Sequence, residues 1–170
     1  MNNRINQLRS YLFDILDTLT KNNNYHINAN FLGDKGDFSL DKIPTASVVE
    51  KWVTGEEMHR DVYSLRSRKG YSQDETTNLE NIGFFEDFEN IIKSNNREGV
   101  LPDINGIQSI ECLNCGTMIA NENGNLATFD IQIQITYKIN EGGSASLWLR
   151  KLLLQKILMQ MESSILQVMN

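Results

Sequence analysis

Apolar side chains recur at two different spacings along this chain, and the two spacings predict separate helical and strand segments. Over residues 3–21 and 73–95 they recur every three or four positions, which places them on one face of an amphipathic helix. The first helix is predicted to bury Ile5, Leu8, Leu12, Ile15, Leu16 and Leu19. The second is predicted to bury Leu79, Ile82, Phe85, Phe88 or Glu89, and Ile92.

The ends of the second helix carry recognisable signals. Ser72 and Glu75 have the spacing of a capping box, in which both side chains satisfy amides of the first turn. Gly99, followed by Pro102, is expected to close the helix. Gly83 lies beside the apolar stripe, where the lack of a side chain would let another element approach closely.

Strict alternation of apolar and polar residues predicts the strongest strand, over residues 129–139. Residues 106–120 form a second β-rich segment, and the dipeptide Asn123-Gly124 between the two is typical of a hairpin turn. We therefore expect a long antiparallel hairpin here. Further strands are expected at residues 25–32, 46–53 and 58–67. Residues 38–44 are expected to be an extended connector, because a residue before proline avoids the helical region.

The end of the chain predicts a further helix. Residues 141–144 resemble a linker, and residues 145–169 follow as a long apolar helix with Leu154 and Met161 seven positions apart and Leu158 and Ile165 beside them. A helix this apolar has to pack against something. The pattern as a whole predicts an α+β fold, with an antiparallel or mixed β-sheet flanked by helices. Residues 1–140 form the predicted domain, and residues 141–170 form an added C-terminal helix.

Composition narrows the class of protein. The chain has 170 residues, within the usual range for one domain, and 16 basic against 22 acidic side chains give a net charge of -6. Such a chain is repelled by nucleic acid unless its cations gather on one surface. Two cysteines are too few for a disulfide scaffold, and the first twenty residues have no apolar signal region, so we expect a reducing cytoplasm. No apolar run reaches the roughly 18 residues of a membrane span.

Few residues point to chemistry, and no catalytic, cofactor or metal site is predicted. Cys112 and Cys115 have the spacing of half a zinc site, but neither a second cysteine pair nor a nearby histidine completes it. His26 and His59 stand in no recognised catalytic pattern. The acidic run Glu86, Asp87 and Glu89, beside Glu80, is typical of a solvated helix face.

The most concentrated positive charge is formed by Arg60, Arg66, Arg68 and Lys69. If the three arginines share one strand face, they form a row of cations. Two interpretations stay open. The row is either a charged edge strand that resists unwanted pairing, or a patch that meets an acidic partner surface or passing DNA.

Several segments resemble a family of phage proteins from low-GC Gram-positive hosts, labelled minor capsid or tail-completion proteins and similar to tail terminators. The segments are Phe31-Leu32-Gly33, then Phe38-Ser39-Leu40-Asp41-Lys42-Ile43-Pro44, and Gly99-Val100-Leu101-Pro102. The helix Asn78-Leu79-Glu80-Asn81-Ile82-Gly83-Phe84-Phe85-Glu86-Asp87-Phe88 and the strand start at residues 127–132 fit the same order. The resemblance covers roughly residues 5–139.

The resemblance implies a non-enzymatic, tail-terminator-like α+β subunit that works in a ring of six and caps the tail tube. Its partners would be the tail tube protein, the head connector or neck, and DNA only as passing cargo. Its location would be the virion, after assembly in the host cytoplasm. The resemblance makes Arg60, Arg66 and Arg68 the candidates to line the channel.

The C-terminal helix departs from the family pattern, which stops soon after the last strand. Three roles stay open for this helix: packing on its own domain, contact with a neighbouring subunit, and binding of another tail protein. If it contacts a neighbouring subunit, the expected anchors are Leu154, Leu158, Met161 and Ile165. Alternative functions are another tail or neck subunit, such as a connector or tube-initiating protein, and a small binding module that uses this helix.

Overall fold

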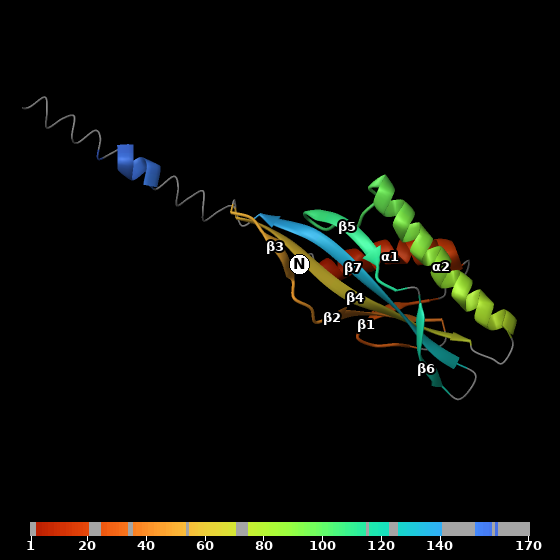
Figure 1. Cartoon of the computed structure of the whole chain (residues 1–170). Coiled ribbons are helices and arrows are strands. Elements are labelled where there is room, and N and C mark those ends of the chain that lie inside the picture. The colour runs from red at the N-terminus through yellow and green to blue at the C-terminus, as the bar shows by residue number, and fades with distance from the viewer. Residues whose placement is uncertain are drawn as a thin grey trace, which may run out of the picture.

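The protein is an α+β structure with a mixed sheet flanked by helices, which confirms the predicted fold class (Figure 1). The computed structural model describes residues 3–20, 25–33, 36–53, 55–70, 75–114, 116–122, 126–140, 152–157 and 159. In chain order the elements are α1 (Arg4–Thr20), β1 (Ile27–Ala29), β2 (Phe38–Ile43), β3 (Val48–Lys51), β4 (Glu56–Gly70), α2 (Glu75–Glu98), β5 (Ile107–Cys112), β6 (Thr117–Glu122) and β7 (Leu126–Asn140).

The sheet is built around two long antiparallel strands, β4 and β7. Each has 15 residues, and they pair along their whole length, from Glu56 opposite Asn140 to Gly70 opposite Leu126. On the β4 side, β2 and β3 each pair with β4, and β1 extends the sheet through a parallel pairing with β2. On the β7 side, β5 and β6 pair with successive parts of β7. The predicted hairpin is confirmed by the pairing of β6 with β7, although its turn at residues 123–125 lies outside the described residues.

Both long helices pack on the same face of the sheet. One core contains buried side chains from α1, from α2 and from the inward positions of the strands. The α1 stripe is confirmed, because Leu8, Leu12, Ile15 and Leu16 are buried and Ile5 and Leu19 pack against the same core. The β7 alternation is confirmed too, since its inward side chains Phe129, Ile131, Ile133, Ile135 and Tyr137 are buried. The opposite face of the sheet therefore carries the polar positions.

The connector predicted at residues 38–44 is wrong, because this segment is strand β2. Phe38 and Leu40 are buried, and the six residues pair with β4 from Ser67 to Val62. Pro44 comes after the last paired residue, so it ends the strand without disturbing a ladder hydrogen bond. The strand predicted at residues 25–32 is shorter, with only Ile27–Ala29 paired.

The predicted inner stripe of α2 is wrong in its first half. Leu79 and Ile82 are exposed, while Phe85, Phe88 and Ile92 are buried as predicted. Asn81 takes an inward position because its Nδ2 donates a 2.8 Å hydrogen bond to the carbonyl of Gly70. This bond satisfies a polar group that burial would otherwise leave unpaired.

The two glycines of this region behave differently. Gly83 has no heavy atom within 4 Å of the position that a Cβ would take, so the expected close approach at Gly83 is wrong. Gly99 follows the last helical residue with a φ of 75°, and the amide of Val100 bonds the carbonyl of Asn95, which confirms the predicted helix end. The predicted Ser72 cap lies outside the described residues.

Candidate interaction surfaces

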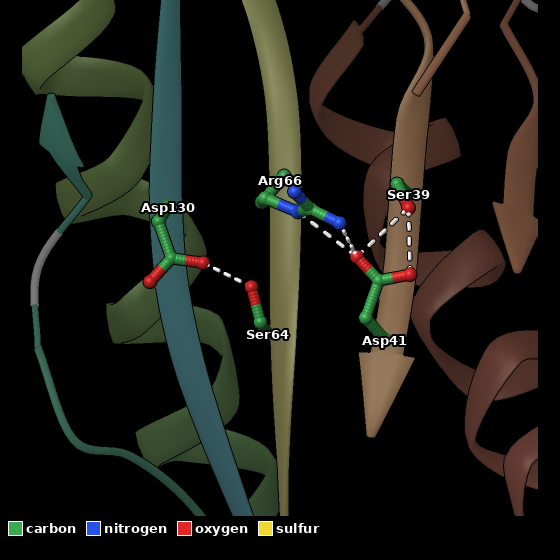
Figure 2. Close-up of polar contacts among 5 residues, drawn as sticks. All are labelled: Ser39, Asp41, Ser64, Arg66 and Asp130. Carbon is green, nitrogen blue, oxygen red and sulfur yellow. Dashed lines mark hydrogen bonds and ion pairs between the residues drawn. The ribbon is translucent and has the colours of Figure 1, made fainter. Parts of the chain in front are cut away.

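The polar face of the sheet carries a hydrogen-bonded network centred on Asp41 of β2. Ser39 Oγ donates to both carboxylate oxygens of Asp41 at 3.0 Å, and Arg66 Nε donates to Oδ2 at 2.9 Å (Figure 2). Arg66 Nη2 also bonds Oδ2, so the guanidinium holds the carboxylate with two nitrogens. Because Ser39 is fully buried, this network is part of the packed sheet rather than loose surface charge.

A second carboxylate lies on the other side of β4. Asp130 of β7 is mostly buried and accepts a hydrogen bond from Ser64 Oγ. Figure 2 shows Ser64 pointing toward Asp130 and Arg66 pointing toward Asp41, so the two side chains of β4 reach opposite neighbours. Side-chain hydrogen bonds thus tie β2, β4 and β7 together across the polar face, in addition to the backbone ladder.

The three arginines of the predicted row do lie on one face of β4, but they are not three equivalent free cations. Arg66 is neutralised by Asp41, and Arg68 Nη1 donates a 2.9 Å hydrogen bond to the carbonyl of Gly33. Arg60 pairs with no carboxylate among the described residues, and its Nε is buried without a hydrogen-bond partner there. The interpretation as a charged edge strand is wrong, because β4 is paired on both sides. The other interpretation, that the row faces an acidic partner surface or passing DNA, stays a prediction and rests chiefly on Arg60.

A buried carboxylate under α1 anchors that helix to the sheet. Asp61, with a side chain only 2% exposed, lies 2.7 Å from Lys42 Nζ and 3.4 Å from Arg4 Nε. Tyr137 OH donates a 3.2 Å hydrogen bond to Asp61, and the Arg4 guanidinium lies 4.6 Å from the Tyr137 ring centroid. Burial, and then the charge of Asp61, raise the pKa of Tyr137. Sequence patterns gave no signal for this cluster, because its members come from four separate elements.

Lys69 is a lysine in an aromatic setting at the end of β4. Its Nζ lies 3.5 Å from the Phe84 ring centroid and 5.7 Å from that of Phe38, and no described residue forms an ion pair with it. It lines a 360 Å³ pocket with Tyr25 and Asn81. Burial lowers the pKa of Lys69 to about 8, because an ammonium group loses hydration there.

Replacing Lys69 by methionine should raise the free energy of unfolding by about 1–2 kcal/mol at pH 7, since the desolvated charge is removed and only part of that gain is offset by the lost cation–π contact. The pKa of Lys69 is lower in the folded state than the ordinary 10.5, so the penalty is present below pH 8. It disappears as pH rises toward 10.5, and the difference between the variant and the wild type should shrink accordingly. Urea denaturation between pH 7 and pH 10 measures this.

The matched control is Lys93→Met, because Lys93 lies on the surface of α2 in an ion pair with Glu89. This variant should change the free energy of unfolding by no more than about 0.5 kcal/mol. A gain for Lys69→Met that does not vary with pH would show that the ammonium of Lys69 is not desolvated.

Several apolar side chains are exposed at the two edges of the sheet. On one edge these are Val48 and Val49 of β3 and Val53 of the following turn; on the other they are Met118 and Ile119 of β6. Neither β3 nor β6 pairs with another described strand on its outer side. Unpaired edges with apolar side chains favour association with other chains.

The C-terminal helix is described only at residues 152–157 and 159, and these are helical. Its described apolar side chains are all exposed, including Leu153 at 64% and the predicted anchor Leu154 at 60%. Figure 1 shows this segment in blue, apart from the sheet and its two long helices. The other predicted anchors, Leu158, Met161 and Ile165, lie outside the described residues.

The remaining candidate chemistry does not assemble into a site. Cys112 is a half-buried cysteine, Cys115 is outside the described residues, and the described side chains include no cluster of three metal-binding groups. His59 Nε2 lies 3.0 Å from Glu57, and hydrogen bonds from Lys51 and then His59 lower the pKa of Glu57.

Within the described part of the chain, no helix combines the length and apolar content that crossing a bilayer requires.

No protein-family model and no curated protein matches the sequence.

Proposed function

We propose that the chain is a structural, non-enzymatic subunit of a bacteriophage virion: a tail terminator that caps the tail tube and joins it to the head connector. It acts as a homo-oligomeric ring, expected to contain six copies, and it uses no cofactor or metal. Its partners are the tail tube protein and the neck, and DNA passes through the ring as cargo. The ring assembles in the host cytoplasm and remains in the virion.

The observation that carries this proposal is that the segments of the family resemblance meet in the core. Phe38, at the start of the segment that ends with Ile43-Pro44, lies 6.3 Å from Phe84 of the helical segment, measured between ring centroids. Phe85 of the same helix lies 5.3 Å from Phe129, at the start of the last strand. Segments far apart in the sequence thus form one aromatic connection between α2 and the sheet. Their joint occurrence therefore has a structural reason, which supports the resemblance.

The shape of the sheet suits a ring subunit. The β4–β7 ladder is continuous along both strands, and side-chain bonds to Asp41 and Asp130 reinforce it on the polar face. Among the described residues the helices cover one face of the sheet, which leaves the polar face, the outer sides of β3 and β6 and the exposed C-terminal segment for contacts with neighbours. In a ring, two different surfaces of each copy must meet, and a closed rotation then limits growth.

In the ring, the polar face of the sheet or the loops beside it would line the channel. Arg60 is the cation of the row best placed to meet passing phosphate, because Arg66 is held by Asp41. Arg60, which pairs with no described carboxylate, would contribute one cation per copy to a ring that attracts DNA without reading its bases.

Light scattering coupled to size exclusion tests the assembly, with tail tubes added in a second experiment and examined by negative-stain electron microscopy. We expect a mass of about six subunits, or rings on the ends of finished tubes. Deleting residues 143–170 should reduce assembly if Leu154, Leu158, Met161 and Ile165 anchor the neighbour. A stable monomer that also fails to bind tail tubes would refute the proposal.

Two alternatives give different results in the same experiments. A connector or tube-initiating subunit would bind other neck proteins or grow into long stacks instead of stopping at one ring. The exposed apolar side chains of residues 152–157 favour, as a second candidate, a small binding module. Such a module would stay monomeric or dimeric and bind a partner peptide through this helix.

A further inference from the structure

Exposed apolar side chains gather on the hairpin formed by β3, the turn after it and the start of β4, here called the β3 hairpin (residues 48–57). The exposed fractions are 48% for Val48, 54% for Val49 and 105% for Val53. Trp52 stands in the same turn, where its amide bonds the carbonyl of Glu56. The hairpin thus exposes three valines within six positions. It lies at an edge of the sheet where no described strand pairs on the outer side, so it offers a surface suited to an apolar partner.

The C-terminal segment is a partner with matching chemistry. Leu152, Leu153, Leu154 and Ile157 are exposed there, so the segment has apolar area to bury. Its charge is also complementary. Glu50 of the β3 hairpin is exposed and has no ion pair with any described residue, while the segment carries exposed Lys156. Arg150 and Lys151 come just before the segment in the sequence. An acidic apolar surface and a basic apolar helix attract each other and bury apolar area together.

We infer that the β3 hairpin of one copy accepts the C-terminal helical segment of a second copy. This inference rests on the proposed ring and names the contact that closes it. Docking occurs between copies because every described side chain of the segment is exposed, so the segment is not seated on its own hairpin. Donor and acceptor are different surfaces of one chain, which makes the contact head-to-tail.

The chain geometry allows this exchange. Strand β7 ends at Asn140, which is paired with Glu56 of the β3 hairpin, so the C-terminal extension leaves the sheet beside the acceptor. Residues 141–151 separate β7 from the segment. Eleven residues span at most about 36 Å when extended, so the connection leaves room for the segment to lie away from its own hairpin.

Three double variants of the full chain test the contact. Val49→Asp with Val53→Asp removes the acceptor, Leu153→Asp with Ile157→Asp removes the donor, and Met118→Asp with Ile119→Asp is the control at the other sheet edge. All six positions are exposed, so the variants should keep the wild-type melting temperature. By light scattering, the acceptor and donor variants should fall from about six subunits to one, while the control keeps the wild-type mass.

Mixing the two monomeric variants is the decisive measurement. The acceptor variant still has an intact helix, and the donor variant still has an intact hairpin. The mixture should therefore form a one-to-one heterodimer and nothing larger. A mixture that stays monomeric overturns the inference.

The outcomes separate this inference from the proposed function. If the acceptor variant still forms rings and the Met118 and Ile119 control does not, the contact lies at β6. That result overturns the inference but leaves the proposed ring intact. A wild-type chain that stays monomeric at every concentration also overturns the inference. The proposed function would then depend on whether that monomer binds tail tubes: binding supports it, and no binding refutes it.

Charge exchange gives an independent readout. Lys156→Glu should weaken self-association roughly five-fold, because it places a carboxylate against Glu50. Adding Glu50→Lys to the same chain should recover the wild-type association. If the two single changes are simply additive, Glu50 and Lys156 do not meet across the interface.

Discussion

Replacing Gly106 by alanine should lower the free energy of unfolding by about 3 kcal/mol. Gly106 has a φ of 76°, and an added Cβ would lie 2.2 Å from the backbone oxygen of Lys138. Neither group can give way easily, because the amide of Lys138 donates a 2.8 Å hydrogen bond to the carbonyl of Gly106. The left-handed conformation alone costs a residue with a side chain about 1–2 kcal/mol, and the clash with the β7 backbone adds to this cost.

Urea denaturation of the Gly106→Ala chain measures the effect, and Gly83→Ala is the matched control. Gly83 is in the interior of α2, and nothing lies within 4 Å of its missing Cβ. Alanine there should raise the free energy of unfolding by about 0.5–1 kcal/mol, because it favours the helix more than glycine does. Equal stability of the Gly106→Ala chain and the wild type would mean that β5 does not start against Lys138 as described.

Replacing Asp61 by alanine should lower the free energy of unfolding by about 3 kcal/mol. The change leaves the buried hydroxyl of Tyr137 without its acceptor and leaves Arg4 and Lys42 without their shared counter-ion. Removing one partner of a buried ion pair is strongly destabilising for this reason. The loss should be smaller than for a fully buried pair, because Arg4 and Lys42 are about half exposed.

A double-mutant cycle isolates the hydroxyl contact, and Asp87→Ala on the exposed face of α2 is the control for loss of a carboxylate. Tyr137→Phe should cost about 1 kcal/mol or more in the wild type and much less in the Asp61→Ala chain. Asp87→Ala should stay within about 0.5 kcal/mol of the wild type. If Tyr137→Phe costs the same in both backgrounds, Tyr137 does not bond Asp61.

The local elements were predictable wherever a short-range spacing decided them. Helix α1 follows from leucines and isoleucines at three- and four-residue spacing, and β7 follows from alternation over residues 129–139. Gly99 ended α2 because a residue with positive φ was needed directly after the helix. In each case the physical cause lies within a few residues of the element, so a single sequence contains it.

The candidate surfaces were only partly predictable. Alternation placed Arg60, Arg66 and Arg68 on one face, but it could not reveal that Asp41, 25 positions before Arg66, neutralises one of them. Asp61 gave no signal, because its partners Arg4, Lys42 and Tyr137 are brought to it by three other elements.

What the sequence by itself determined is the class of the fold, the amphipathic face of α1, the inward side of β7 and the unusual apolar character of the C-terminal helix. Only the tertiary structure decided that residues 38–43 pair with β4 as a strand, that Asn81 replaces Leu79 and Ile82 on the inner face of α2, and which charges neutralise each other. The physical reason is distance along the chain. Periodicity is set by neighbours a few residues away, whereas strand pairing, burial of a polar group and ion pairing depend on residues that only folding brings together.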